Sequence, residues 1–592
     1  MTAFLPQQET FYPWVLRKLR LMLDRRLYQY DYTHVSPLAI LKDLPITDHF
    51  AFDWLLMVGE KVLQNLANRT ELEIGSVLKH HQTQHAALSK LLDIRDSLGL
   101  ELKKQVLEAL HFDGRFGAPA VTAKSLQEYA DMFRKIGLPP IAKDFQDDRV
   151  FASMRIAGPN PIMLQRLNAL DERLLITSAM FQTAVSQNSP GSKDSLDAAV
   201  AEGRLYLADY AVLNGAELGT FPNGQKYVYA PLALFVITGA RKELLPVAIQ
   251  CQQKPAADNP VITPNDGYNW LIAKTIVETA DGNLHEASTH LGRTHLAMEA
   301  FVMASYRQLG NNHPLSVLLW PHFEGTLAIN NASWKYLVSD RGAVDKLCGG
   351  TIQATRSVAA HGLQNLSVMG DQLPLTFARR GVDDRDAFPE YPFRDDSLLY
   401  WDAIHEWVAA YIRIYYQTDS DIQQDYELRA WGRELVSQDG GRLKGLPNNG
   451  AIQRIEELID VVTFVIYTCS VQHAAVNFPQ YDCMSYVPNM PLAGYRPAPT
   501  SKSGATEADF VAMLPTLDMA ELQMETTNLL GGVHYTVLGQ YGRQLDDPRV
   551  AAPLQTFQQR IANIGSTIIE RNQSRRPYHT LAPSGIPQSI NI

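Results

Sequence analysis

The chain has 592 residues, of which 46% are hydrophobic, 20% charged and 9% aromatic. This composition excludes collagen-like, coiled-coil and disordered chains, and the length allows a large buried core. The net charge of -10 argues against nucleic acid as a partner, because proteins that bind it need a basic surface to displace counterions from phosphates.

The N-terminal residues 1–11 are polar and lack the charged-then-apolar order of a signal peptide. The most apolar stretch, residues 458–476, is short and interrupted by polar residues, so we expect a buried core helix and no transmembrane span. The four cysteines have no C-x-x-C spacing and indicate core thiols in a reducing compartment. We therefore expect a cytoplasmic protein that is at most peripheral at a membrane.

Residues 11–31 mix cationic and apolar side chains at helical spacing and predict an amphipathic helix. One alternative is that this helix packs on the body of the protein. The other is that it contacts a membrane, because helices that combine basic and aromatic residues favour lipid interfaces. Further helical periodicity between residues 36 and 135 falls in the segments 38–44, 52–66, 89–94 and 103–112.

Strand character is concentrated between residues 203 and 251, where β-branched and aromatic runs are bounded by Gly, Pro and Asn. After residue 269 the pattern is helical almost to the end. The fold class predicted is mainly α, with a small antiparallel β subdomain. The expected organisation is an N-terminal amphipathic helical extension (1–35), then one domain (36–592) with a β-rich insertion at about 203–251.

The segment HEASTHLGRTH places His285, His290 and His295 at intervals of five. In an α-helix, residues five apart point about 140° away from each other, so two such histidines could not share a metal. A π-type bulge with i to i+5 bonding would align them, and such bulges concentrate at functional sites. A single histidine is more often an ordinary core or surface residue, but three in register favour a metal site.

A second segment, VQHAAVNF, places His473 and Asn477 four residues apart, on one face of a helix. Alone, such a pair is more often structural. No H-E-x-x-H or G-x-S-x-G motif is present, so neither a zinc peptidase nor a serine hydrolase is indicated.

These segments together resemble the lipoxygenase family. Residues 269–330 are similar to its signature, VQHAAVNFPQYD to its second metal-ligand helix, and the terminal GIPQSINI to its C-terminus. The resemblance covers nearly everything after residue 35. It implies a large helical catalytic domain without the N-terminal β-sandwich of eukaryotic members, as in a minimal bacterial or cyanobacterial type.

The resemblance also implies the site. One non-heme iron would be held by His290, His295, His473, Asn477 and the main-chain carboxylate of Ile592. Manganese is the less favoured metal, and neither heme nor a nucleotide is implied. His285 would lie next to the ligands without binding the metal, and Glu286 and Gln480 would be polar side chains that link the metal site to the substrate cavity.

The activity implied is insertion of O2 into polyunsaturated fatty acids with a cis,cis-1,4-pentadiene, of the linoleic, linolenic or arachidonic type. A ferric hydroxide would take a hydrogen atom from the doubly allylic carbon, and the product would be a fatty acid hydroperoxide. Imidazoles with one carboxylate suit iron, whereas a thiolate cluster would suit zinc. The alternative is a catalytically silent lipid-binding protein with the same fold.

Leu337 and Val344 match cavity-wall positions of the family, although both could be plain core residues. Where the family commonly has alanine or glycine to select S or R oxygenation, this chain has Ser333, with Ala332 one residue earlier. Trp334 departs from the arginine usual after that position. Serine is closer to alanine in bulk, which favours S products.

Overall fold

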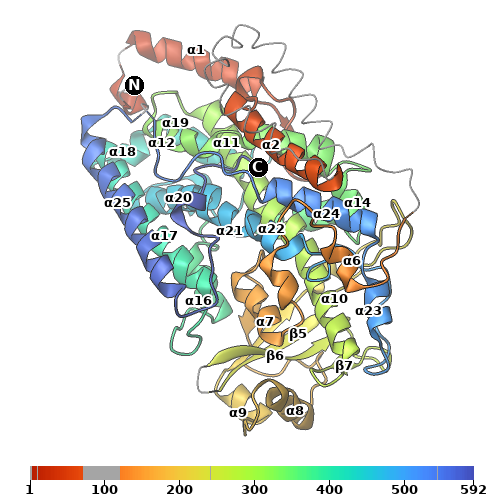
Figure 1. Ribbon diagram of the computed structural model, residues 1–592. Coiled ribbons are helices and arrows are strands. Elements are labelled where there is room, and N and C mark those ends of the chain that lie inside the picture. The colour runs from red at the N-terminus through yellow and green to blue at the C-terminus, as the bar shows by residue number, and fades with distance from the viewer. Residues whose placement is uncertain (1–2, 10, 71–119, 240–241, 543–544) are drawn as a thin grey trace.

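A computed structural model describes residues 3–9, 11–70, 120–239, 242–542 and 545–592. Helices dominate it, and one small sheet lies at an end of the helical body (Figure 1). The longer α-helices are α1 (Phe11–Leu27), α2 (Phe52–Thr70), α7 (Asp148–Ala157), α8 (Ser178–Asn188), α10 (Tyr268–Leu284), α11 (Ala297–Gln308), α12 (Pro314–Phe323), α15 (Ile352–Gln364), α17 (Pro392–Tyr415), α19 (Tyr426–Val436), α20 (Ile455–Tyr467), α24 (Leu517–Leu530) and α25 (Pro548–Arg571).

Shorter α-helices connect or extend these: α6 (Leu126–Ala130), α9 (Leu196–Ala201), α13 (Thr326–Ala332), α14 (Ala343–Leu347), α16 (Leu373–Arg380), α18 (Asp419–Gln424), α21 (His473–Asn477), α22 (Pro479–Met484) and α23 (Glu507–Met513). Three segments are π-helical: η7 (His285–Leu296), η8 (Ser333–Leu337) and η10 (Thr468–Gln472). Short 3-10 turns are η1 (Pro6–Gln8), η2 (Ile46–Asp48), η5 (Pro140–Lys143), η6 (Ala211–Leu213), η9 (Pro447–Gly450) and η11 (Pro583–Gly585). The predicted mainly α class is confirmed.

The β subdomain is a five-stranded antiparallel sheet in sequential order, with α7 and α8 packed against β6. Its two central strands are buried almost throughout, because their faces are covered on both sides. The strands are β3 (Leu164–Arg166), β4 (Leu205–Asp209), β5 (Leu232–Thr238), β6 (Glu243–Gln250) and β7 (Val261–Ile262). The predicted strand region therefore contains β4 to β6, while the outer β3 and β7 were not predicted.

Not every helical prediction before residue 135 holds. The helix at 52–66 is confirmed by α2, but the helix expected at 38–44 is wrong: Ile40–Leu41 is strand β2, paired with β1 (Tyr30–Asp31). Pro37 and Pro45 enclose this segment, and prolines remove backbone donors and bias the preceding residue toward extended conformations. The helices expected at 89–94 and 103–112 lie outside the described residues.

Two long continuous helical segments, called rods below, carry the histidines of the predicted metal site and His285. The first runs through α10, η7 and α11, and nearly all its residues are buried. The second, Ile455–Met484, is long and apolar enough to cross a membrane by length and composition, but 89% of its most apolar window is buried inside the fold. It is thus a core helix, as predicted for residues 458–476.

The two ends of the chain are placed differently. The C-terminal tail runs into the middle of the helical body and ends there (Figure 1). By contrast, α1 lies on the outside, against α11. The β1–β2 pair joins residues on either side of position 35. The domain boundary expected at that position stays a prediction.

Candidate metal centre

The π-helix η7 covers His285–Leu296 and confirms the predicted widening of this segment. It brings the rings of His290 and His295 to 4.8 Å between centroids, although the residues are five apart. Gly292 lies between them at a tight contact, where an added Cβ would meet the Ala359 carbonyl oxygen at 2.5 Å. The backbone of α15 therefore packs so closely on η7 that this position needs a residue without a side chain.

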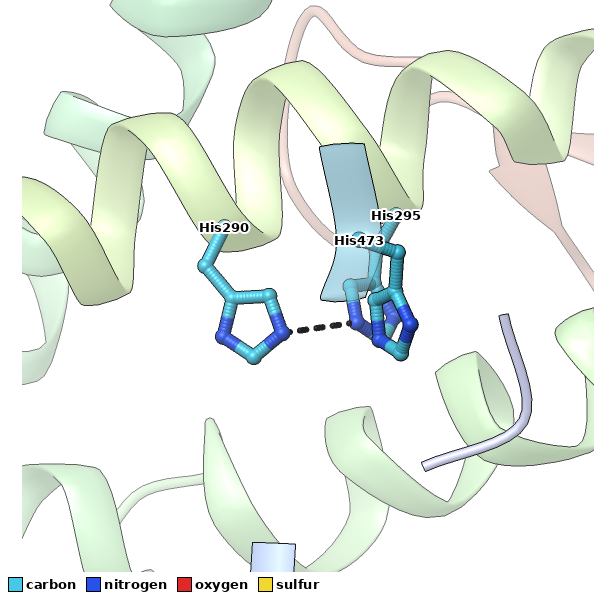
Figure 2. Close-up of side chains that lie close together, drawn as sticks. All are labelled: His290, His295 and His473. Atoms are coloured by element: carbon cyan, nitrogen blue, oxygen red, sulfur yellow. Dashed lines mark hydrogen bonds between the residues drawn. The ribbon is translucent and has the colours of Figure 1, made fainter. Parts of the chain in front are cut away.

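His473 joins this pair from the second rod (Figure 2). Its ring centroid lies 5.2 Å from that of His295 and 5.7 Å from that of His290. One nitrogen of each of the three rings lies within 4.8 Å of the others, and all three side chains are buried. The arrangement is one that could hold a metal ion.

Hydrogen bonding fixes the tautomer of His295. The amide nitrogen of Asn330 donates to the backbone carbonyl of His295 at 3.2 Å and to Oε2 of Glu299 at 2.7 Å. The amide oxygen of Asn330 therefore faces Nδ1 of His295, at 2.8 Å, and must accept its proton. It follows that Nε2 of His295 carries the lone pair.

Nε2 of His295 lies 3.2 Å from Nε2 of His290. Nδ1 of His290 lies 3.8 Å from the Glu286 carboxylate, within ion-pair range but beyond a hydrogen bond. At 3.2 Å an Nε2–H of His290 can donate to the Nε2 lone pair of His295, and the same spacing suits two neighbouring imidazole ligands of one metal ion. This contact therefore fits a bound metal ion.

The last residues of the chain lie beside the same histidines. The backbone oxygen of Ile592 is 3.1 Å from Nε2 of His473. Trp54 donates to the carbonyl of Asn591 at 2.6 Å, and Thr326 donates to the carbonyl of Ile590 at 3.0 Å. These bonds hold the terminal carboxylate beside the histidines.

Asn477 follows His473 by one turn in α21, which is regular α-helix as expected. Its amide nitrogen donates to the carbonyl of Leu530 at 2.8 Å, and its oxygen accepts from Gln480 at 2.8 Å. The amide is thus locked with its oxygen free to make one further contact. The π-helix η10, which directly precedes His473, was not predicted from the sequence.

His285 points elsewhere. Its Nε2 is 2.7 Å from the carbonyl of Val476, and its Nδ1 is 3.4 Å from Glu286. Although burial opposes a charge on either group, the ion pair raises the pKa of His285 and lowers that of Glu286. His285, Glu286 and His290 form a second group that could bind a metal, but Nε2 of His285 is already hydrogen-bonded to Val476, and its Nδ1 has only the ion-pair contact with Glu286.

Burial also sets the charge of the three clustered histidines. It lowers the pKa of His290, lowers that of His473 well below its usual value, and lowers that of His295 to about 3, with neighbouring histidines acting in the same direction on the last two. All three rings are therefore neutral at pH 7. Neutral imidazole is the form that binds metals.

Glu299 and Asn330 form a chain of contacts behind His295 that sequence reasoning missed. Glu299 is fully buried and accepts from the backbone N–H of Leu41 at 2.6 Å as well as from Asn330. Burial raises its pKa to about 7, against the effect of these hydrogen bonds. Two sequence features could have pointed to these residues. Glu299 is an acid one helical turn after His295, and Asn330 is a polar residue at the end of the apolar run LAIN.

Replacing Asn330 by alanine is expected to weaken metal binding about 10- to 100-fold, because outer contacts that orient a ligand imidazole typically have effects of that size. The measurement is metal affinity of the full chain by equilibrium dialysis. Asn331→Ala, in the next position of α13, is the matched control and should bind metal normally. Equal affinity in the two variants would show that Asn330 does not orient His295.

A cavity opens directly onto the clustered histidines. His290, His295 and Ile592 line it, together with Glu286 and Gln480. Most other lining residues are aliphatic, including Leu291, Ile329, Val338, Leu347, Leu492 and Leu530. An apolar cavity with few polar groups suits a hydrocarbon ligand.

The predicted substrate residues are distributed unevenly. Ser333, Leu337 and Val344 line the cavity. Ala332 is buried in α13 and is absent from the described cavity wall. Of these two neighbours only Ser333 lines the cavity, and a role of either residue in oxygen steering stays a prediction.

Residues 48–590 match the sequence model of the family described as Lipoxygenase. The chain belongs to the lipoxygenase family. It is 40% identical over 488 residues to a linoleate 9/13-lipoxygenase of Pseudomonas aeruginosa, an alignment that covers 79% of this chain and 70% of the relative. This relative also shows that the resemblance seen in the short motifs extends through most of the chain.

Solved lipoxygenase structures agree with this membership. The crystal structure of a coral 8R-lipoxygenase matches with a TM-score of 0.85 and 28% identity, covering 100% of this chain and 83% of that one. A lipoxygenase crystallised anaerobically with arachidonate matches with a TM-score of 0.84 and 28% identity, covering 100% and 84%. This lipoxygenase is thus a dioxygenase that acts on polyunsaturated fatty acids, and a silent lipid-binding role is not favoured.

Proposed function

We propose that this lipoxygenase uses one non-heme iron, held by His290, His295, His473, Asn477 and the carboxylate of Ile592. The observation that carries the proposal is the buried cluster of three imidazoles, whose ring nitrogens lie within 4.8 Å of one another. Three neutral imidazoles, an amide oxygen and one carboxylate match the preference of non-heme iron for mixed nitrogen and oxygen ligands. Neither metal-binding group among the described residues includes a cysteine, which disfavours a zinc thiolate site, although the buried Cys348 lines the same cavity.

Bound iron would supply the one-electron chemistry that starts oxygenation of a pentadiene. The protein's own contribution is to position the substrate and exclude water. The aliphatic wall of the cavity fixes the hydrocarbon chain beside the histidines, and the buried terminal carboxylate is the one anionic ligand. Glu286 and Gln480 line the same cavity and contact the ligand residues, so they would transmit substrate binding to the metal.

The test is an anaerobic iron-loading experiment on the full chain, followed by oxygen uptake with linoleic and arachidonic acids. We expect one iron per chain and uptake that scales with iron content. Chiral chromatography of the products tests the oxygen-steering proposal, which expects mainly S hydroperoxides because of Ser333. An iron-loaded protein that consumes no oxygen with either acid would contradict the proposal, and equal activity with manganese would remove the preference for iron.

Contact with a membrane surface is a further part of the proposal. On α1 most large apolar side chains are exposed, with Leu19 49% and Leu23 56% exposed, whereas Leu21 is buried. The inward face instead carries Arg17, which pairs with Glu427 at 2.7 Å. Arg20 and Arg26 lie among the exposed leucines, where they could meet anionic headgroups. The free cysteines support a cytoplasmic location, which puts the inner leaflet within reach.

The double variant Leu19→Ser/Leu23→Ser is expected to bind anionic vesicles at least about 10-fold more weakly, since each inserted leucine contributes about 1 kcal/mol or more. Co-sedimentation with phosphatidylglycerol vesicles measures this. A matched control, Leu175→Ser/Leu375→Ser, changes two equally exposed leucines away from α1, 61% and 52% exposed. Equal binding by both double variants would exclude α1 as the contact.

A further inference from the structure

A second cavity, of about 140 Å³, lies where the two π-helical segments η7 and η10 meet. Arg293 and Thr289 of η7 line it, as do Thr468 and Gln472 of η10. It shares no lining residue with the cavity beside the histidines. The two cavities therefore lie against different faces of η7, and η10 lines only the second cavity.

Positive charge dominates this second cavity. Arg293, Arg379 and Arg380 line it, whereas Asp371 is the one carboxylate among its lining residues in the described part of the chain. Asp371 is already saturated, because it pairs with Arg293 at 2.9 Å and with Arg379 at 2.6 Å. It also accepts from the backbone N–H of Ser367 at 2.9 Å. Two positive charges thus remain without a counter-charge among the lining residues.

The guanidinium of Arg380 has no carboxylate partner among the cavity residues that the structure describes. Its Nη1 donates only to neutral oxygens, the Tyr391 hydroxyl at 3.1 Å and the Leu164 carbonyl at 3.3 Å. Its Nη2 is buried and has no hydrogen-bond partner. A buried guanidinium N–H without an acceptor is costly, so an acceptor in the cavity would be favourable. Arg379 differs, since 58% of its side chain is exposed and solvent can screen it.

We propose that this cavity binds a small tetrahedral oxyanion, with inorganic phosphate as the simplest example. Arg380 supplies a guanidinium that has no carboxylate partner among the described lining residues, Arg293 supplies further N–H donors beside Asp371, and Thr468 and Gln472 supply neutral polar groups. Guanidinium groups match phosphate geometry through paired N–H donors. At about 140 Å³ the cavity has room for phosphate. The bound anion would tie η7 to η10 and stabilise both.

The test is isothermal titration of inorganic phosphate into the metal-free full chain at pH 7, with ionic strength held constant by sodium chloride. We expect one saturable site per chain and a rise in Tm that saturates with it. Sulfate should compete, because it has the same shape. The absence of saturable binding would overturn the proposal, and so would acetate binding as tightly as phosphate.

Arg380→Gln is expected to weaken phosphate binding at least 10-fold, while Arg433→Gln, an exposed arginine on α19 outside the cavity, should leave it unchanged. If Arg380→Gln fails to fold, Thr468→Val decides, because it removes a hydroxyl from the cavity without changing charge and should weaken binding about 3- to 10-fold. Binding that survives both cavity substitutions at full strength would overturn the site. These measurements are made without iron, so their outcome is independent of the proposed metal centre.

Discussion

Replacing His295 by alanine is expected to remove bound iron and oxygen uptake together. His295 contributes a lone pair whose direction is fixed by Asn330, at 2.8 Å, and its ring contacts both other histidines. The loss should exceed the 10- to 100-fold expected for Asn330, because a ligand disappears instead of being loosened. Iron per chain, measured after loading and desalting, is the direct readout.

Two further histidine variants make this test specific. His361→Ala changes an exposed histidine on α15 and should retain both iron and activity. His285→Ala separates the two groups of metal-binding side chains, since His285 belongs only to the second. We expect it to keep most of its iron. Loss of iron in His285→Ala together with full iron in His295→Ala would place the metal in the group formed by His285, Glu286 and His290. That result would contradict the proposed ligand set.

The histidine spacing is the most informative local signal in the sequence. An interval of five is incompatible with a shared metal on an α-helix, so the spacing by itself predicts a π-helix. The protein has that helix, from His285 to Leu296. The prediction succeeds because the signal lies within one helix, where residue spacing and side-chain direction are linked by geometry alone.

Contacts between distant segments could not be predicted in this way. Glu299 is joined to Leu41, 258 positions earlier, and to Asn330, 31 positions later. Neither contact leaves a spacing pattern. The strand at Ile40–Leu41 has the same origin: its apolar residues look helical in isolation, but pairing with β1 and the bond to Glu299 decide its conformation. Tertiary contacts here override local periodicity.

The role of the C-terminus lies between these two cases. The resemblance of GIPQSINI to the family pointed to a terminal carboxylate, but no pattern in the sequence explains physically why the tail enters the core. The structure supplies the reason: Trp54, Thr326 and His322 each bind a carbonyl of the last five residues. Burying a chain end is costly unless its polar groups are satisfied, and these three side chains satisfy them.

Adding two glycines after Ile592 is expected to reduce bound iron to background. The extension converts the carboxylate into a neutral amide and forces extra chain into a position where Ile592 is only 4% exposed. The site then loses its one anionic ligand, beside Nε2 of His473 at 3.1 Å. Ile592→Val is the matched control, because it alters the side chain and keeps the carboxylate, and it should hold iron like the parent chain. Full iron in the extended chain, measured on folded protein of unchanged circular dichroism, would show that the terminal carboxylate is not a ligand.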